Sequence, residues 1–164
     1  MHPNIYAVER NNHLITYSPH TLTSKVGLSL VMGMTYKETV FQGAMARCEY
    51  PPIFKKSIRE FIASAQSQQK HPSLKLYLAG GCGYGINPSK LTINGKITSI
   101  RDFTLNQLKE AGLLNNIKGD NMCRMPICLE EHLASLTLDL STGEAIFGKS
   151  STRNYKTQQR HIRA

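Results

Sequence analysis

The chain has 164 residues and a formal net charge of +9, with 40% hydrophobic and 7% aromatic residues. This length suits one domain that buries its own core, and the hydrophobic fraction is too high for a disordered chain. The sequence has no apolar run of about 18 residues to span a bilayer, and its start, MHPNIYAVER, lacks the apolar centre of a signal peptide. We therefore expect one cytoplasmic domain without membrane insertion.

The positive charge is concentrated towards the C-terminus. From Lys149 onward there are five cations and no acidic residue. Basic runs of this kind are usually solvated. We therefore expect residues 1–148 to form the folded domain and residues 149–164 to form a basic, disordered tail. Contact of this tail with phosphate groups or an acidic partner is the alternative.

The first third of the sequence alternates apolar and polar residues with the period of two that β-strands have. Residues Asn4–Glu9 and His13–Tyr17 flank Arg10-Asn11-Asn12, which predicts a hairpin that turns at these three residues. The next strand carries three apolar residues on one face: Val26, Leu28 and Leu30. Val40–Arg47 is predicted as a fourth strand. Pro51 ends it, because proline lacks the backbone N–H donor that a sheet needs.

The period changes to that of an amphipathic helix between Lys55 and Gln69. Apolar residues there recur at i, i+3, i+4 and i+7 and form one stripe: Ile58, Phe61, Ile62 and Ala65. A strand follows, with Leu74, Leu76 and Leu78 in alternation, and it runs into the glycines around Cys82.

A second helix is predicted from Ser99 to Gly112. Ser99 and Asp102 form a partial capping box, and glycine suits the left-handed position after a helix. Leu133–Leu140 and Glu144–Phe147 then form a closing hairpin around Ser141-Thr142-Gly143. This order of strands and helices predicts a layered α/β (α+β) domain.

Two stretches resemble the active-site motifs of a known family. TLTSKVGLSL (Thr21–Leu30) and QGAMARCEYP (Gln42–Pro51) are similar to the motifs TLGSCVAVCL and GGMAHFMLP of the CheD family, the bacterial chemoreceptor glutamine deamidases. LKLYLAGGC (Leu74–Cys82) and LTLDLSTGEAIF (Leu136–Phe147) follow in the order that the family has. The resemblance implies a CheD-like layered sandwich of mixed β-sheets flanked by helices.

The resemblance also indicates which residues occupy the reactive positions. In the CheD family a cysteine of the first motif is the nucleophile and a histidine of the second activates it; Lys25 and Arg47 stand at these positions here. Lysine is protonated at neutral pH, and arginine cannot accept the proton at all. The resemblance therefore implies a catalytically degenerate homologue that binds a signalling partner, such as a chemoreceptor or a CheC-like phosphatase.

Other chemistry stays open. A relocated pair of Cys82 with His20 would supply the thiolate and imidazole that amide hydrolysis needs. Lys25 and Arg47 would instead repel by up to about 4 kcal/mol at 4 Å, so a bound anion between them would relieve the repulsion. Thr21 and Ser24 lie beside Lys25 in the first motif and would join such an anion pocket. A basic module that binds nucleic acid or another polyanion is the third possibility.

Three residues have a spacing loosely compatible with zinc: Cys123, Cys128 and His132. No second pair of closely spaced cysteines completes the set. The glycines after Leu78 match neither of the common phosphate-loop patterns. We therefore expect no metal and no cofactor.

Overall fold

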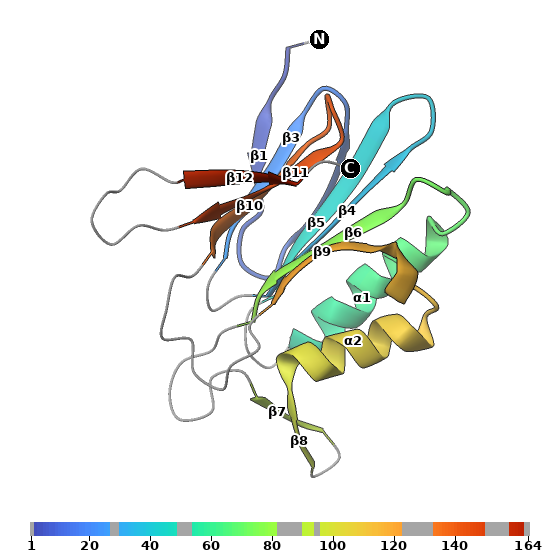
Figure 1. The fold of residues 1–164 in the computed structure, drawn as a ribbon, viewed down its shortest axis with the longest axis vertical. Helices are drawn as coiled ribbons and strands as arrows, with labels where there is room; N and C mark the ends of the chain where they lie inside the picture. The colour runs from blue at the N-terminus through green and yellow to red at the C-terminus, as the bar shows by residue number, and fades with distance from the viewer. Residues whose placement is uncertain are drawn as a thin grey trace.

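The computed structural model describes residues 2–26, 30–48, 54–81, 90–93, 96–122, 133–149 and 158–162. These residues form two five-stranded β-sheets, a two-stranded hairpin and two α-helices. The two large sheets pack face to face, and both helices lie against the outer face of one of them (Figure 1). The fold is therefore an α+β sandwich of mixed sheets flanked by helices, as the sequence predicts.

Neither of the two described helices lies on the outer face of the first sheet, sheet A (Figure 1). Its strands, in spatial order, are β1 (Ile5–Ala7), β3 (Thr21–Lys25), β10 (Leu133–Asp139), β11 (Glu144–Lys149) and β12 (Gln158–Ile162). The short strand β1 runs parallel to β3, and every other pair is antiparallel.

The second sheet, sheet B, lies between sheet A and the helices. Its strands, in spatial order, are β2 (His13–Tyr17), β5 (Phe41–Cys48), β4 (Leu30–Lys37), β6 (Lys75–Gly80) and β9 (Ile117–Met122). Only β6 and β9 are parallel. The remaining elements are α1 (Phe54–Ser67), α2 (Ile100–Glu110), the 3-10 turn η1 (Leu114–Asn116) and the hairpin of β7 (Lys90–Ile93) with β8 (Lys96–Ser99).

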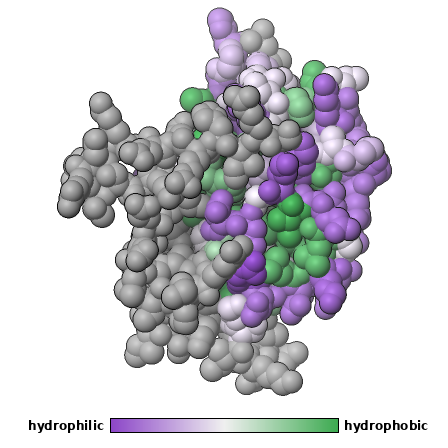
Figure 2. Space-filling view, viewed as in Figure 1, coloured by the Kyte–Doolittle hydropathy of each residue, from purple (hydrophilic) through white to green (hydrophobic). Residues whose placement is uncertain are grey.

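Both faces of sheet B are covered, which gives the domain two cores. Along β4, Val31 packs towards sheet A, whereas Met32 packs towards the helices. Seven consecutive residues of β4 are buried for this reason, and the strand lacks the polar–apolar alternation that the sequence analysis relied on. At the rim of the helix-side core Leu105 and Ile117 are only partly buried, and Figure 2 shows an apolar area on the helix-bearing face.

Both helices form where the sequence predicts them. The four residues of the apolar stripe on α1 are all buried in the helix-side core. At the start of α2 the Ser99 hydroxyl accepts a hydrogen bond of 2.9 Å from the Asp102 N–H. After α2, Gly112 has a φ of 73°, the left-handed conformation that favours glycine. The closing hairpin of β10 and β11 is also confirmed, with Asp139 opposite Glu144.

The predicted N-terminal hairpin is wrong. Strand β1 pairs with β3 in sheet A, whereas β2 pairs with β5 in sheet B. The residues between them cross from one sheet to the other: the Asn11 N–H donates to the Arg47 carbonyl oxygen at 2.8 Å, and the Arg47 N–H donates to the Asn12 carbonyl oxygen at 3.1 Å. This crossing buries Val8 between the sheets, which a local hairpin would leave on the surface.

The single strand predicted across Val26, Leu28 and Leu30 is also wrong. Strand β3 ends at Lys25 in sheet A, and β4 starts at Leu30 in sheet B. Leu28 lies outside the described residues. The alternation of apolar residues across this junction therefore spans two strands of different sheets.

Part of the expected tail has regular structure. Residues Gln158–Ile162 form β12, which pairs antiparallel with β11 so that Arg160 lies opposite Phe147. Lys149, the first residue of the expected tail, is the last residue of β11. Residues 150–157 and 163–164 lie outside the described part of the chain.

Candidate functional site at one end of the sandwich

The two CheD-like motifs run towards the same end of the sandwich. In sheet B, Leu30 lies opposite both Cys48 and Gly80, and Gly80 lies opposite Met122. In sheet A, β3 ends with Lys25 at this same end of the sandwich. The packing between the sheets shows the alignment: Leu138 packs against Gly33 near this end, and Leu140 packs against Gly43 farther from it. We call the end formed by these five strand ends the motif end: Lys25, Leu30, Cys48, Gly80 and Met122.

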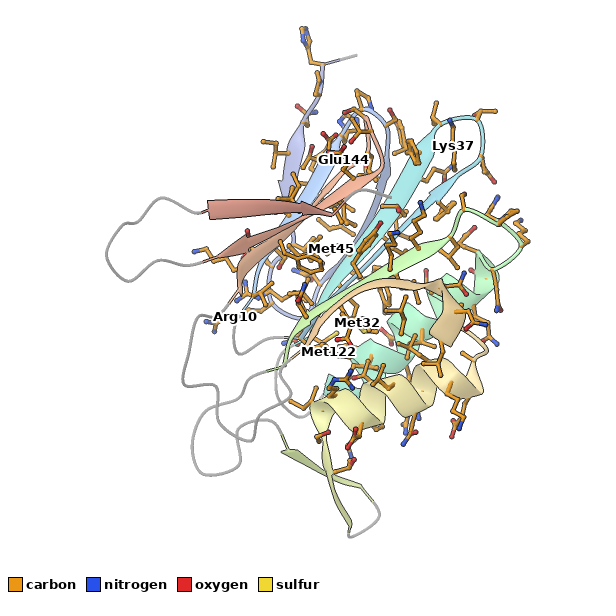
Figure 3. The ribbon with its side chains drawn as sticks, viewed as in Figure 1. Arg10, Met32, Lys37, Met45, Met122 and Glu144 are labelled. Atoms are coloured by element: carbon orange, nitrogen blue, oxygen red, sulfur yellow. The ribbon has the colours of Figure 1, made fainter. Side chains whose placement is uncertain are left out.

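Figure 3 shows which labelled side chains lie at each end of the sandwich. Arg10 and Met122 lie at the motif end, whereas Lys37 and Glu144 lie at the opposite end. Arg10 belongs to the crossing segment that hydrogen bonds to Arg47 through its neighbours Asn11 and Asn12. The motif end therefore gathers cations from the crossing segment, from β3 and from β5.

Lys25 and Arg47 share this end but belong to different layers. Lys25 is exposed, and it alternates with the buried residues Leu22 and Ser24, so it lies on the outer face of sheet A. Arg47 is half-buried, and it has the same parity as Met45, which packs between the two sheets. The backbone thus directs the two side chains towards different layers, and an anion pocket between them stays a prediction.

The hydroxyl residues of the first motif hold the N-terminal strand. The Ser24 hydroxyl is buried and donates a hydrogen bond of 2.9 Å to the Val8 carbonyl oxygen. The Thr21 N–H donates to the Asn4 carbonyl oxygen at 2.9 Å. Ser24 is therefore engaged in joining β1 to β3, and its part in an anion pocket stays a prediction.

The histidine of the predicted relocated pair is also part of the framework. His20 is 5% exposed, and its Nδ1 accepts a hydrogen bond of 3.1 Å from the Asn4 N–H. The rings of Tyr6 and Tyr17 contact it edge-on, with centroid distances of 5.3 Å and 5.6 Å. These contacts fix the imidazole where β3 begins, at the end opposite the motif end.

Cys82, the other member of that pair, lies outside the described residues. The residue before it, Gly81, lies at the motif end, where a Cβ atom would be 3.2 Å from Ile100 Cγ2. The eight residues of β5 separate this end from His20, a length of about 25 Å. The predicted pair of Cys82 with His20 stays a prediction.

Cys48 is the one cysteine within the described ranges, and its thiol is buried. Burial, and to a smaller extent the nearby carboxylate of Glu60, together raise the pKa of Cys48 to about 12. His13 lies opposite Ala46 on the same face of sheet B, and its ring is 5.6 Å from that of Phe61. Burial lowers the pKa of His13, although Glu60 opposes that shift.

The sequence analysis missed that Cys48 and His13 lie on the same face of sheet B, because this depends on the placement of β2 beside β5. The arrangement does not make a nucleophile. A thiol with a pKa near 12 is almost entirely protonated at neutral pH, and the thiolate is the reactive form. The described part of the chain therefore contains no activated cysteine.

A partly buried ion pair lies near the motif end and was not predicted either. Arg101, in the first turn of α2, contacts Asp120 of β9, with 2.7 Å between Nη2 and Oδ2. The second carboxylate oxygen of Asp120 accepts a hydrogen bond of 3.1 Å from the Met122 N–H. The pair ties the start of α2 to the end of β9, so it stabilises the scaffold around the motif end.

Within the described ranges, no three His, Cys, Asp or Glu side chains lie close enough together to hold a metal ion. Cys123, Cys128 and His132, whose spacing is only loosely compatible with zinc, lie outside these ranges. None of the helices that the structure describes is long and apolar enough to cross a membrane.

No protein-family model matches the chain, and no curated protein matches it. The similarity to the CheD family therefore depends on the two motifs and on the order of the segments that follow them.

Proposed function

We propose that this chain is a CheD-like protein that has lost deamidase chemistry and binds a signalling protein through the motif end. One observation carries the proposal. The two positions at which the family has its reactive cysteine and histidine hold Lys25 and Arg47, and the strands that carry them finish at the same end of the sandwich. The inert thiol of Cys48 supports the loss of chemistry.

The chemistry of the motif end suits an acidic segment of a partner. Arg10, Lys25 and Arg47 belong to it. Of the acidic residues near it, Asp120 forms an ion pair with Arg101, and Glu60 lies near the buried Cys48. Cations at such a surface increase the rate of encounter with an acidic partner and help to select it. The cytoplasmic helices of a chemoreceptor, or a CheC-like phosphatase, are the partners that the resemblance suggests.

The test combines an activity assay with a binding assay. The protein is incubated with the cytoplasmic fragment of a chemoreceptor, ammonia release is followed, and glutamine-to-glutamate conversion is sought by peptide mass spectrometry. We expect no conversion but a measurable complex in biolayer interferometry. Conversion by the unmodified chain would refute the loss of chemistry.

Charge reversal identifies the binding surface. Lys25→Glu and Arg47→Glu should each weaken the complex, and the effect should decrease with added salt. Lys118→Glu is the matched control, because Lys118 is an exposed cation near the start of β9 and so lies away from the motif end. Equal losses in all three variants would indicate a non-specific effect of charge and would count against this surface.

Restoring the family residues tests the ancestry. The double variant Lys25→Cys with Arg47→His reintroduces a thiol and an imidazole at the two motif positions. The backbone directs positions 25 and 47 towards different layers, so the double variant converts receptor glutamines only if the two side chains still meet at the motif end. In that case Lys25→Cys alone should convert them much more slowly, because it lacks the base. Equal activity of the two variants would argue against an assembled pair.

The basic C-terminal segment supports a second candidate function, the binding of a polyanion. The pairing of β12 with β11 places Arg160 on an edge strand of sheet A, and Lys149 ends the neighbouring strand. Binding to duplex DNA or heparin should then weaken steeply with salt. Arg160→Gln is a better test than truncation after Gly148, because truncation also removes a strand.

A further inference from the structure

The imidazole of His20 accepts a hydrogen bond that depends on its protonation state. The ring is buried, and its Nδ1 accepts from the Asn4 N–H at 3.1 Å. A ring nitrogen accepts a hydrogen bond only when it carries no proton, whereas both nitrogens of a protonated imidazole are donors. The observed bond therefore requires a neutral ring with its proton on Nε2. A proton on Nδ1 would place two donors against each other.

The groups that pack around His20 offer no counter-charge to a protonated ring. Tyr6 of β1 and Tyr17 of β2 contact the ring, and tyrosine phenols carry no charge in the pH range in which histidine titrates. Within the described ranges, no ion pair includes His20. Burial of an unpaired charge is costly, so this environment favours the neutral ring.

The charged side chains nearest to this end of the sandwich have other directions or partners. Asp139 and Glu144 lie opposite each other and alternate with residues buried between the sheets, so they lie on the outer face of sheet A. Glu38 Oε1 is 3.3 Å from His71 Nε2. The ammonium group of Lys37 lies over the aromatic ring at the start of β5. None of these four charged residues therefore compensates a charge on His20.

Strand β1 has few other contacts at its first residues. It is the three-residue edge strand of sheet A, and all three residues are exposed (Figure 1). The Thr21 N–H donates to the Asn4 carbonyl oxygen at 2.9 Å. At the other end of β1, Val8 is buried between the sheets, and its N–H donates to the Thr23 carbonyl oxygen at 2.8 Å. Val8 is therefore the firmly held end of this segment.

The backbone of His20 is held more firmly than that of Asn4. The His20 N–H donates to the Tyr17 carbonyl oxygen at 3.0 Å, and the His20 carbonyl oxygen accepts from the Leu140 N–H at 3.1 Å. Asn4 is exposed and precedes the edge strand. Repulsion between a protonated ring and the Asn4 N–H is therefore relieved by displacement of Asn4.

We propose that His20 is a pH-sensitive switch that holds β1 on sheet A when neutral and releases residues 4–7 when protonated. Release opens the edge of β3, because the register partners of Thr21, Leu22 and Thr23 are the three residues of β1. It stops at Val8, so the crossing segment keeps its hydrogen bonds to Arg47 at the motif end.

Proton linkage sets the size of the effect. The released state binds one proton more than the held state. The ratio of released to held molecules therefore increases up to about tenfold for each pH unit below about 6.5, where histidine in solution takes up its proton.

The first test is hydrogen exchange followed by mass spectrometry on the full chain between about pH 8 and pH 5, with rates normalised to those of the unfolded chain. Protection of the peptide that contains residues 4–8 should fall up to about tenfold per pH unit below about 6.5. Protection of β4, the central strand of sheet B, is the internal reference and should stay constant.

Two variants separate His20 from other titrating groups. His20→Asn supplies a carbonyl oxygen close to the position of Nδ1, which accepts from the Asn4 N–H without titrating. This variant should keep the peptide protected at every pH. His13→Gln is the matched control, because the ring of His13 contacts Phe61 on the helix-bearing face of sheet B, and it should leave the pH dependence of β1 unchanged.

The second test examines the unmodified chain and needs no variant to fold. Nitrogen NMR of the histidine rings at about pH 8 should show His20 with its proton on Nε2 and none on Nδ1. A proton on Nδ1 at this pH would overturn the proposal, because the bond from Asn4 could not form.

The exchange data are equally decisive. A β1 peptide that is unprotected at pH 8, or whose protection does not change with pH, contradicts the switch. So does an equal loss of protection in β4, which would indicate unfolding of the whole domain, or an equal pH dependence in His20→Asn. None of these assays includes a signalling partner, so the result is independent of the proposed function.

Discussion

Alkylation of Cys48 tests the claim that the described part of the chain holds no activated thiol. Its pKa is raised from the ordinary 9.0 to about 12, and the side chain is fully buried. A shift of about three pH units lowers the thiolate population at pH 8 by roughly a thousandfold. Since the thiolate is the form that reacts, iodoacetamide should modify native Cys48 at least about a thousand times more slowly than Cys48 of the unfolded chain.

The assay quenches the reaction at successive times and quantifies each cysteine-containing peptide by mass spectrometry. A parallel reaction in guanidinium chloride gives the rate for the unfolded chain. Glu60→Gln is a useful variant, because removal of the carboxylate lowers the pKa of Cys48 and should speed the reaction modestly. A native rate within about tenfold of the unfolded rate would refute the reasoning. Cys48 with His13 would then be a candidate catalytic pair.

Three further predictions concern the scaffold. Burial lowers the pKa of His13 from 6.5, so the unfolded chain binds the proton more tightly than the folded chain does. The free energy of unfolding, measured in urea, should therefore fall as the pH decreases below about 6.5. His13→Gln should flatten this pH dependence. Gly43→Ala should destabilise the fold by about 1–3 kcal/mol, because its Cβ would lie 2.7 Å from Leu140 Cδ2 and 3.0 Å from the Met34 carbonyl oxygen. Gly33→Ala should have a smaller effect in the same urea titration, since its nearest contact is the movable Leu138 Cδ1 at 3.1 Å; an equal effect would contradict this explanation. Asp120→Ala should cost about 1–3 kcal/mol because it removes the ion pair with Arg101 and a hydrogen bond from the Met122 N–H. Glu110→Ala, on the exposed end of α2, should have little effect in thermal unfolding.

The helices show which parts of a fold local sequence can predict. The predicted range for α1, Lys55–Gln69, differs by one or two residues from the observed Phe54–Ser67, because an apolar stripe with helical period has one compact solution. The start of α2 was predicted from Ser99 and the end from Gly112, both of which act through contacts within a few residues.

The strands show where local pattern fails. The N-terminal hairpin was predicted because two alternating segments flanked a short turn, yet each segment pairs with a distant strand. Strand β4 escaped recognition because both of its faces are buried. Strand β9, with the sequence IKGDNM, was missed because its pattern is weak and its place depends on parallel pairing with β6.

For the candidate site too, some features can be predicted from the local sequence, whereas others depend on the tertiary structure. The presence of Lys25 and Arg47 where the similar CheD motifs have a cysteine and a histidine can be read from the sequence, because it needs only residue identity and order. The separation of His20 from Gly81 cannot, because it depends on the direction in which β3 and β6 run. The pairing of His13 with the neighbourhood of Cys48 likewise requires the register of β2 against β5.

Residue identity and local period were thus sufficient for the fold class, for both helices, for the closing hairpin and for the cations at the motif positions. These features depend on interactions between residues that are near one another in sequence. The assignment of each strand to sheet A or sheet B, the raised pKa of Cys48 and the hydrogen bond between Asn4 and His20 arise only when distant segments pack together. Burial and strand pairing are properties of the assembled sandwich, and no single stretch of this chain contains them.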